Sequence, residues 1–359
     1  MKQVKWLAVC LALLMMTACA NQQGETPVTR QVIAMDTVME FTLYGEGAGD
    51  IVQTAVEEIQ RLEDLLSKTD PASEVFQLNE RAGERVEASE TLYALTAAAC
   101  GYTTETEGCF DITVAPLVDA WGFTGENQRV PSSEELAELL PLVGSDRITL
   151  ESGEDGDFIT LDAGQSIDLG GIAKGYASDC LAALFAAQGA ERGWVSLGGN
   201  VLAWGTRPDG DPWRVGIQDP QYPDQQQYVG LVGLENAFAV TSGGYQRYFE
   251  ENGRTYHHIL DPATGYPADS ELISVTVVAD ADTAGGTGTT RPGSGTMCDA
   301  FSTALFVMGE ERALDFWRGS QRDFDLILVT DDGRVLVTEG IADQFTLQEG
   351  SGYTYETVS

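Results

Sequence analysis

The feature that most constrains the fold is a series of short strand-like segments between residues 194 and 278. Turns rich in glycine, aspartate and proline separate them. Helical periodicity falls mainly outside this region, at 51–66, 89–104, 172–187 and 300–317. Strands that alternate regularly with helices would give a parallel sheet, whereas grouped strands favour antiparallel pairing. The sequence therefore predicts an α+β fold of mixed antiparallel sheets with packed helices.

Several further segments have recognisable patterns. Strand-like alternation covers 31–44, and a serine-led helix start after Pro131 predicts a helix to about residue 140. Hairpins are expected at 148–161 and 326–337. The Gly/Thr-rich stretch 280–297 is expected to be a flexible surface insertion. A role in gating access to a binding site or in docking a partner is a hypothesis for it.

The N-terminus has the layout of a secretory signal. Lys2 and Lys5 precede an apolar run that is too short to span a bilayer comfortably, and small residues then lead to Cys19. This resembles a lipobox, in which Cys19 would be lipidated; the alternative is an ordinary signal peptide cleaved nearby. We expect a signal at 1–18, a polar tether at 19–30 and a folded domain at 31–359, anchored on the extracytoplasmic face of the cell membrane.

Charge and cysteine content exclude several classes of function. The formal net charge is −36 and becomes −38 when the two lysines of the signal are removed, which opposes binding to nucleic acid. Four cysteines remain beyond Cys19 and form no CxxC pair, so a zinc or iron–sulfur site is not indicated. A Cys100–Cys109 disulfide and buried free thiols both remain open.

Two stretches are candidates for anion or metal binding. Asp168 to Lys174 (DLGGIAK) stands at a strand-to-helix junction, where glycines allow a ligand close to the backbone and a helix N-terminus attracts anions. The alternative is that Asp168 only caps the helix. Asp299 and Thr303 are four residues apart, on one face of an expected first helical turn, and their oxygens suit Mg²⁺. The alternative there is again a capped helix.

The only two histidines, His257 and His258, are adjacent. On a strand, neighbouring side chains point to opposite faces, so one of the two can face a site. Histidine is the usual general base near neutral pH. Two structural histidines are the alternative.

Taken in order, these stretches resemble a known family. The segments are AMDT, LSKTDPASEVFQLN, GCFDITVAPLVDAWGF, DLGGIAKGYASD, VSLGGNVLAWG, AVTSGGYQRYFEENGRTYHHILDPATGYP and CDAFSTALFVMG. Together they resemble the FAD:protein FMN transferase (ApbE) family over residues 31–340. The resemblance implies a T-fold-related architecture and Mg²⁺-dependent transfer of FMN from FAD to a threonine hydroxyl of a target flavoprotein, with release of AMP. Membrane electron-transfer subunits or FMN-binding domains are the implied acceptors.

The resemblance also implies roles for individual residues. His258 matches the expected base, and Gly171, Asp299 and Thr303 match the metal ligands, with Gly171 acting through its carbonyl. The implied FAD contacts are Met35, Thr69, Cys109, Phe110, Asp111, Asp168, Lys174 and Leu260. A hydrolytic FAD pyrophosphatase and a non-catalytic FAD-binding lipoprotein are the alternative functions.

The chain departs from the family pattern at several positions. Ser302 stands where some members have a second aspartate, which leaves both the strength of the metal site and the number of bound metal ions open. Thr69 takes a place that is often aromatic, so flavin stacking would be lost there. Asp36 replaces a common glycine, Gly244 replaces a polar residue, and His257 is expected to be a bystander.

Overall fold

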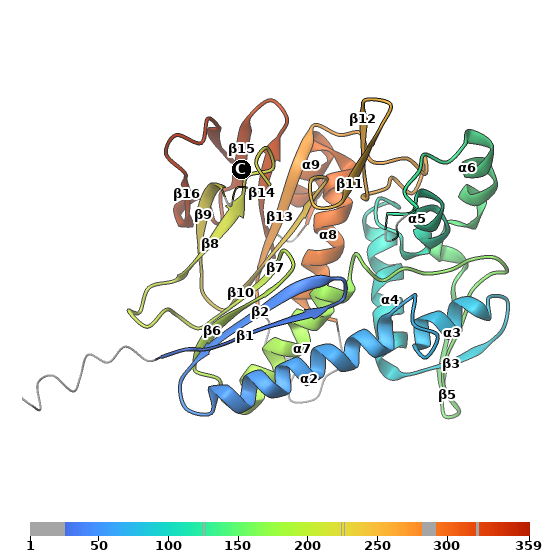
Figure 1. The fold of residues 1–359 in the computed structure, drawn as a ribbon, viewed down its shortest axis with the longest axis horizontal. Helices are drawn as coiled ribbons and strands as arrows, with labels where there is room; N and C mark the ends of the chain where they lie inside the picture. Colours follow the sequence, from blue (N-terminus) through green and yellow to red (C-terminus); the bar gives the residue numbers. More distant parts are fainter. Residues whose placement is uncertain are drawn as a thin grey trace, which may run out of the picture.

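The computed structural model describes residues 26–123, 125, 127–223, 225, 227–281, 292–320 and 323–359. The expected signal peptide and Cys19 lie outside these residues. Within them, a nine-stranded sheet forms the centre of the molecule (Figure 1), and its neighbouring strands are antiparallel except for one parallel pair, β15 and β17. In spatial order its strands are β1 (Val28–Ala34), β2 (Thr37–Tyr44), β6 (Arg192–Leu197), β7 (Asn200–Trp204), β10 (Ala237–Gly243), β13 (Leu272–Asp280), β14 (Asp325–Thr330), β15 (Arg334–Thr338) and β17 (Thr354–Val358).

Three helices cover one face of this sheet: α2 (Ala48–Leu66), α7 (Ala173–Gln188) and α8 (Ser294–Met308). The buried positions of α2 recur every three or four residues, as in Ile59, Leu62 and Leu66. By contrast, α8 is buried on almost every side, because α7, β10, β13 and the following helix α9 (Glu310–Gly319) all contact it. The main hydrophobic core lies between these helices and the sheet.

A small three-stranded sheet covers part of the opposite face. Its strands are β16 (Phe345–Leu347), β9 (Tyr228–Leu234) and β8 (Trp213–Gln218), in that order. Side chains such as Ile217 and Val232 form a second core with Val278 and Ile327 of the large sheet. Because β13 is covered on both faces, it is apolar along most of its length rather than alternating.

The remaining elements lie at the helix-covered side and around one end of the central sheet (Figure 1). A third core joins Trp121, Phe123, Leu136 and Leu260. The elements are the sheet β3 (Val86–Ala88), β5 (Gly156–Thr160) and β4 (Thr149–Gly153), the hairpin β11 (Tyr248–Glu251) and β12 (Arg254–His257), and helices α3 (Glu74–Glu80), α4 (Glu90–Glu105), α5 (Ala115–Trp121) and α6 (Ser133–Leu139).

The structure confirms the α+β class and a helix in each predicted helical segment, with 300–317 divided between α8 and α9. Serine side chains accept the backbone N–H three residues ahead at the starts of α3, α4 and α6, through Ser73, Ser89 and Ser132. The strand-like alternation over 31–44 is confirmed as two strands, because Met35 and Asp36 form a tight turn between β1 and β2.

Two predicted boundaries also differ from the structure. Strand β1 begins at Val28, within the expected tether. Helix α8 begins at Ser294, so the last residues of the predicted insertion are helical; residues 282–291 of that insertion lie outside the described part.

The four cysteines in the described residues, including Cys100 and Cys109, are free thiols. Across the described ranges, no helix combines the length and apolar character needed to cross a membrane.

Candidate functional site

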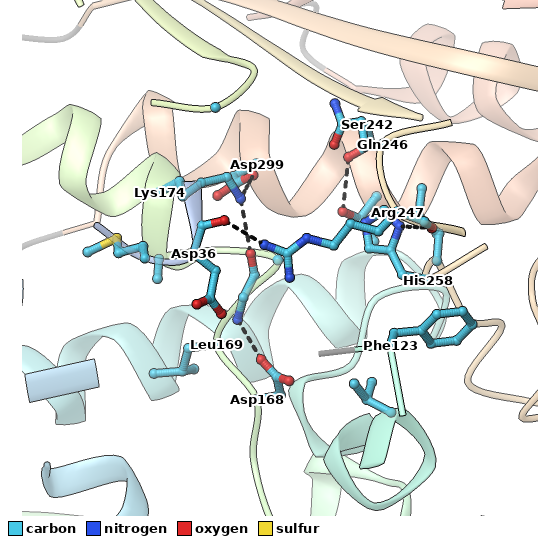
Figure 2. A pocket seen from close by; sticks show the side chains of 18 of the residues that line it. Asp36, Phe123, Asp168, Leu169, Lys174, Ser242, Gln246, Arg247, His258 and Asp299 are labelled. Carbon is cyan, nitrogen blue, oxygen red and sulfur yellow. Dashed lines mark hydrogen bonds and ion pairs between the residues drawn. The ribbon is translucent and has the colours of Figure 1, made fainter. Parts of the chain in front are cut away.

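One cavity of about 820 Å³ lies between the β1–β2 turn, the end of α2 with the segment that follows it, the start of α7, the middle of α8 and the end of β12. Its lining is nearly half polar by residue type, and Figure 2 shows several of its charged side chains converging. The cavity brings together all twelve residues that the sequence suggested as site residues: Met35, Thr69, Cys109, Phe110, Asp111, Asp168, Gly171, Lys174, His258, Leu260, Asp299 and Thr303.

The DLGG stretch forms a turn held by the Asp168 carboxylate. Its Oδ1 accepts the N–H of Gly170 at 2.8 Å, and its Oδ2 lies 2.9 Å from Nζ of Lys68. Helix α7 starts at Ala173 after Ile172, which makes no side-chain cap. The alternative that Asp168 caps this helix is therefore wrong; it shapes the turn before the helix and pairs with a lysine.

Asp299 instead caps α7 from the neighbouring helix. Its Oδ2 accepts the N–H of Gly175, in the first turn of α7, at 2.8 Å. Asp299 is the sixth residue of α8 and only 3% exposed, so the expected position in a first helical turn is wrong. A carboxylate is favourable beside the positive end of a helix dipole.

Three hydroxyl groups from α8 and β10 form a hydrogen-bonded group close to Asp299. The hydroxyl of Ser242 lies 3.2 Å from Oγ1 of Thr303 and 2.8 Å from Oγ of Ser302. The Ser302 hydroxyl also donates to the carbonyl of Asp299 at 3.0 Å. A β-carbon built on Gly171 would lie 3.8 Å from Oγ1 of Thr303, so the DLGG turn and α8 are adjacent here.

This donor set fits a hard divalent cation. Asp299 Oδ1 has only Lys174, at 4.0 Å, as its ionic partner among the described residues. Those residues contain no cluster of three or more His, Cys, Asp or Glu side chains suited to a metal. Mg²⁺ is commonly bound by one or two carboxylates together with substrate phosphates, so one carboxylate with hydroxyl and carbonyl oxygens is sufficient protein support.

Lys174 brings positive charge to the same place. Its Nζ donates to the carbonyl of Gly170 at 3.2 Å and faces Asp299. Figure 2 places the two side chains together on one wall of the cavity.

His258 is held in one tautomer. Both its backbone N–H and its Nδ1 lie 3.1 Å from the carbonyl of Arg247. A carbonyl can only accept, so Nδ1 carries the proton and Nε2 keeps a lone pair. Burial, together with the nearby charges of Arg247 and Lys174, lowers the pKa of His258 to about 4. The ring is therefore neutral near pH 7 and able to accept a proton.

His257 is packed as a structural residue. Its Nε2 lies 3.0 Å from the carbonyl of Ala268, and its ring meets Phe306 edge-on, with ring centres 5.4 Å apart. A β-carbon on Gly244 would come within 2.9 Å of the His257 ring. Glycine at 244 thus leaves room for the second histidine.

The segment 109–111 forms another wall. The Asp111 carboxylate accepts the N–H of Thr113 at 2.8 Å and of Ser145 at 3.0 Å, so it joins two loops. Burial raises the pKa of Cys109, which keeps it a thiol, and Arg312 donates to its sulfur at 3.4 Å.

The β1–β2 turn closes the cavity from the far side. Met35 and Asp36 have φ of 48° and 57°, a left-handed conformation that favours glycine. The turn is held because Met35 N–H donates to Glu63 at 2.8 Å and Arg247 donates to the Asp36 carbonyl at 3.0 Å. This explains how a non-glycine residue is accommodated at 36.

Thr69 and Leu260 occupy the edges of the cavity. Thr69 is exposed and its hydroxyl lies 3.2 Å from that of Ser67, while Leu260 belongs to the third core. Sequence reasoning missed Lys68, Ser242 and Arg247, which also line the cavity. Their partners are far away in the sequence, and no local spacing indicated them.

The fold and the site define a class of protein. An α+β domain that combines a carboxylate–hydroxyl oxygen set, three cationic side chains and a neutral histidine in one large cavity is suited to an enzyme acting on a phosphate-containing ligand. The particular family follows from comparison: the ApbE family model matches residues 35–328, and the chain belongs to that family.

Relatives match over nearly their whole lengths. An FAD:protein FMN transferase of Haemophilus influenzae is 32% identical over 344 residues, covering 92% of this chain and 95% of the relative. One from Vibrio cholerae is 30% identical, covering 91% and 95%. The crystal structure of the ApbE protein of Thermotoga maritima has a TM-score of 0.79 and 33% identity, covering 89% of this chain and 99% of the other. For the flavinyl transferase ApbE of Pseudomonas stutzeri, the TM-score is 0.74 and the identity 26%, with 89% and 97% covered.

Proposed function

We propose that this chain is an FAD:protein FMN transferase that moves FMN from FAD to a threonine hydroxyl of an acceptor protein and releases AMP. The supporting observation is that one cavity holds a neutral histidine together with the oxygen set around Asp299. The names of the relatives support the flavin transfer, and the chemistry of the cavity supports the finer steps.

FAD would occupy the cavity of about 820 Å³, which is within the size range of pockets for large ligands. Met35, Thr69 and residues 109–111 would contact it along the walls. Lys174, at the start of α7, would face its pyrophosphate, because a helix N-terminus and an ammonium group both favour an anion. Asp168 and Leu260 would complete the contacts.

Mg²⁺ would be held by Asp299, Thr303 and the carbonyl of Gly171. When bound, it would neutralise charge on the pyrophosphate oxygens, as in other phosphoryl transfers. Ser302 supplies no carboxylate, and its hydroxyl already contacts Ser242 and the α8 backbone. A single protein carboxylate therefore serves the metal.

His258 would act as the general base. Its Nε2 would take the proton of the threonine hydroxyl as the threonine oxygen forms a bond to the FMN-side phosphorus. The bond from that phosphorus to the bridging oxygen breaks, and the oxygen leaves with AMP. The Arg247 carbonyl keeps the required tautomer throughout, because it accepts from Nδ1.

The test is incubation of the protein with FAD, Mg²⁺ and an FMN-binding acceptor domain. We expect AMP release and flavin fluorescence that stays with the acceptor on a denaturing gel. EDTA and His258→Ala should abolish both products, whereas His257→Gln should retain them. AMP without labelled acceptor would favour the pyrophosphatase alternative, and retained FAD with neither product would favour the binding-protein alternative.

We also propose that Cys19 is lipidated and anchors the enzyme at the extracytoplasmic membrane face, near its acceptor. The sequence around Cys19 supports this. Cells grown with a labelled fatty acid should label the protein, and Cys19→Ser should lose the label and leave the membrane fraction. A labelled, membrane-bound Cys19→Ser protein would contradict the anchor.

A further inference from the structure

Arg247 is connected to both sides of the cavity. It follows β10 and immediately precedes β11, and its backbone carbonyl holds the ring of His258. Its side chain extends across the cavity to the β1–β2 turn (Figure 2), where Nη2 donates to the carbonyl of Asp36 at 3.0 Å. Arg247 therefore orients the proposed base, His258, through its backbone and places its own guanidinium in the same cavity.

The guanidinium has no carboxylate partner within ion-pair distance among the described residues. The two lysines of the cavity, by contrast, each have a carboxylate partner. Lys68 Nζ lies 2.9 Å from Asp168 and 2.7 Å from Asp119, and Lys174 faces Asp299. Arg247 is half-buried, and its one hydrogen bond in the cavity goes to a neutral carbonyl. A guanidinium has five donors in a planar fork suited to carboxylate or phosphate, so most of its binding capacity is unused.

The position of the Arg247 guanidinium indicates which part of FAD it would contact. Arg247 and Lys174 are both near enough to His258 for their charges to affect its ring. In the proposed reaction the base must lie beside the hydroxyl that attacks the FMN-side phosphorus. A cation whose own backbone carbonyl is hydrogen-bonded to the base therefore lies near that phosphate rather than near either ring system of FAD.

We propose that the guanidinium of Arg247 binds the FMN-side phosphate of FAD and stabilises the charge that builds up there during transfer. This rests on the proposed function. The guanidinium exchanges all or part of its hydrogen bond with Asp36 for charge-assisted bonds to the phosphate. As the phosphorus bonds to the threonine oxygen and its bond to the bridging oxygen breaks, Arg247 neutralises the equatorial oxygens.

The test compares the binding of FMN and riboflavin, which differ only by the phosphate. Affinities are measured by flavin fluorescence in EDTA, so that neither metal nor transfer is required. Arg247→Gln should reduce the preference for FMN over riboflavin by about tenfold or more, because a hydrogen-bonded charge is lost. Arg247→Lys should retain part of the preference. AMP should bind as tightly as before.

Arg254→Gln is the matched control. This arginine is on β12 of the same hairpin, its guanidinium lies 5.3 Å from the ring centre of Tyr256, and it does not line the cavity. It should leave the preference for FMN unchanged. If Arg247→Gln weakens riboflavin as much as FMN, or leaves their ratio unchanged, Arg247 only holds the turn and the inference is wrong. Because the measurement is of binding, it is independent of whether FMN is ever transferred.

Discussion

Alanine substitution should have opposite effects on stability at two helical glycines, Gly175 at the crossing of α7 and α8 and Gly101 on the open surface of α4. A β-carbon on Gly175 would lie 2.3 Å from the carbonyl oxygen of Gly295 and 2.6 Å from Cβ of Asp299. Carbon atoms in contact are normally about 3.5–4.0 Å apart. Gly175→Ala therefore requires α8 to move away by about 1 Å. Gly101, within α4, is exposed and has no atom within 4 Å of its added β-carbon.

The expected magnitudes follow from these surroundings. Alanine is favoured over glycine in a helix by roughly 1 kcal/mol, so Gly101→Ala should raise the free energy of unfolding by up to about that amount. At Gly175, overpacking costs about 1–3 kcal/mol, and the obstacle is backbone that cannot rotate aside. We expect a net loss of about 1–2 kcal/mol there. Urea unfolding with unchanged m-values would measure both effects.

Activity should separate the two variants further. Gly175 donates to the carboxylate of Asp299, so a shift of about 1 Å displaces the proposed metal ligand. A displacement of this size can lower a rate about 100-fold. Gly101→Ala should transfer FMN like the wild type. If Gly175→Ala were stabilised like Gly101→Ala, or kept full Mg²⁺-dependent transfer, this account of the crossing would be refuted.

Three further outcomes are expected. Asp179→Asn should lower the free energy of unfolding, measured in urea, by about 1–3 kcal/mol. Both oxygens of the Asp179 carboxylate accept N–H groups at the start of α8, whereas an amide has only one accepting oxygen. An unchanged unfolding midpoint would contradict this role. In His257→Gln, the one remaining histidine, His258, should titrate by NMR near pH 4 rather than near its ordinary 6.5. Since the unfolded chain binds that proton first, this group should make stability increase between about pH 4 and 6.5, and a midpoint near 6.5 would contradict the assigned burial. Asp299→Asn should remove most of the thermal stabilisation by Mg²⁺ in the presence of FAD, and an undiminished shift would exclude Asp299 as a ligand.

Local patterns predicted most helices but failed where tertiary contacts decide the conformation. The turn at Met35 and Asp36 contains no glycine, so alternation alone could not separate β1 from β2. Gly293 and Gly295 suggested a loop, yet α8 begins at Ser294. The helix is capped by Asp179, which lies more than a hundred residues earlier in the sequence. Its carboxylate accepts hydrogen bonds from the N–H groups of both glycines.

In the candidate site, too, local sequence patterns indicated some residues and missed others. Ordered motifs were enough to suggest twelve residues that line one cavity, because each motif carries its site residue within a few positions of a recognisable turn or helix start. They did not indicate Lys68 or Arg247. The partners of these two, Asp168 and Asp36, are about 100 and 211 positions away, and only folding brings them together.

Helix α8, which carries two of the proposed metal ligands, and helix α7, which follows the third, also complete each other's ends. Asp179 of α7 accepts from the first turn of α8, and Asp299 of α8 accepts from the first turn of α7. One oxygen of Asp299 is thus used by the fold, while the other faces Lys174 and the cavity. Because the fold already orients this carboxylate, binding of Mg²⁺ would require little rearrangement. The residue that serves the chemistry is therefore also one that fixes the packing, which is why a change at Gly175, outside the cavity lining, is expected to affect both.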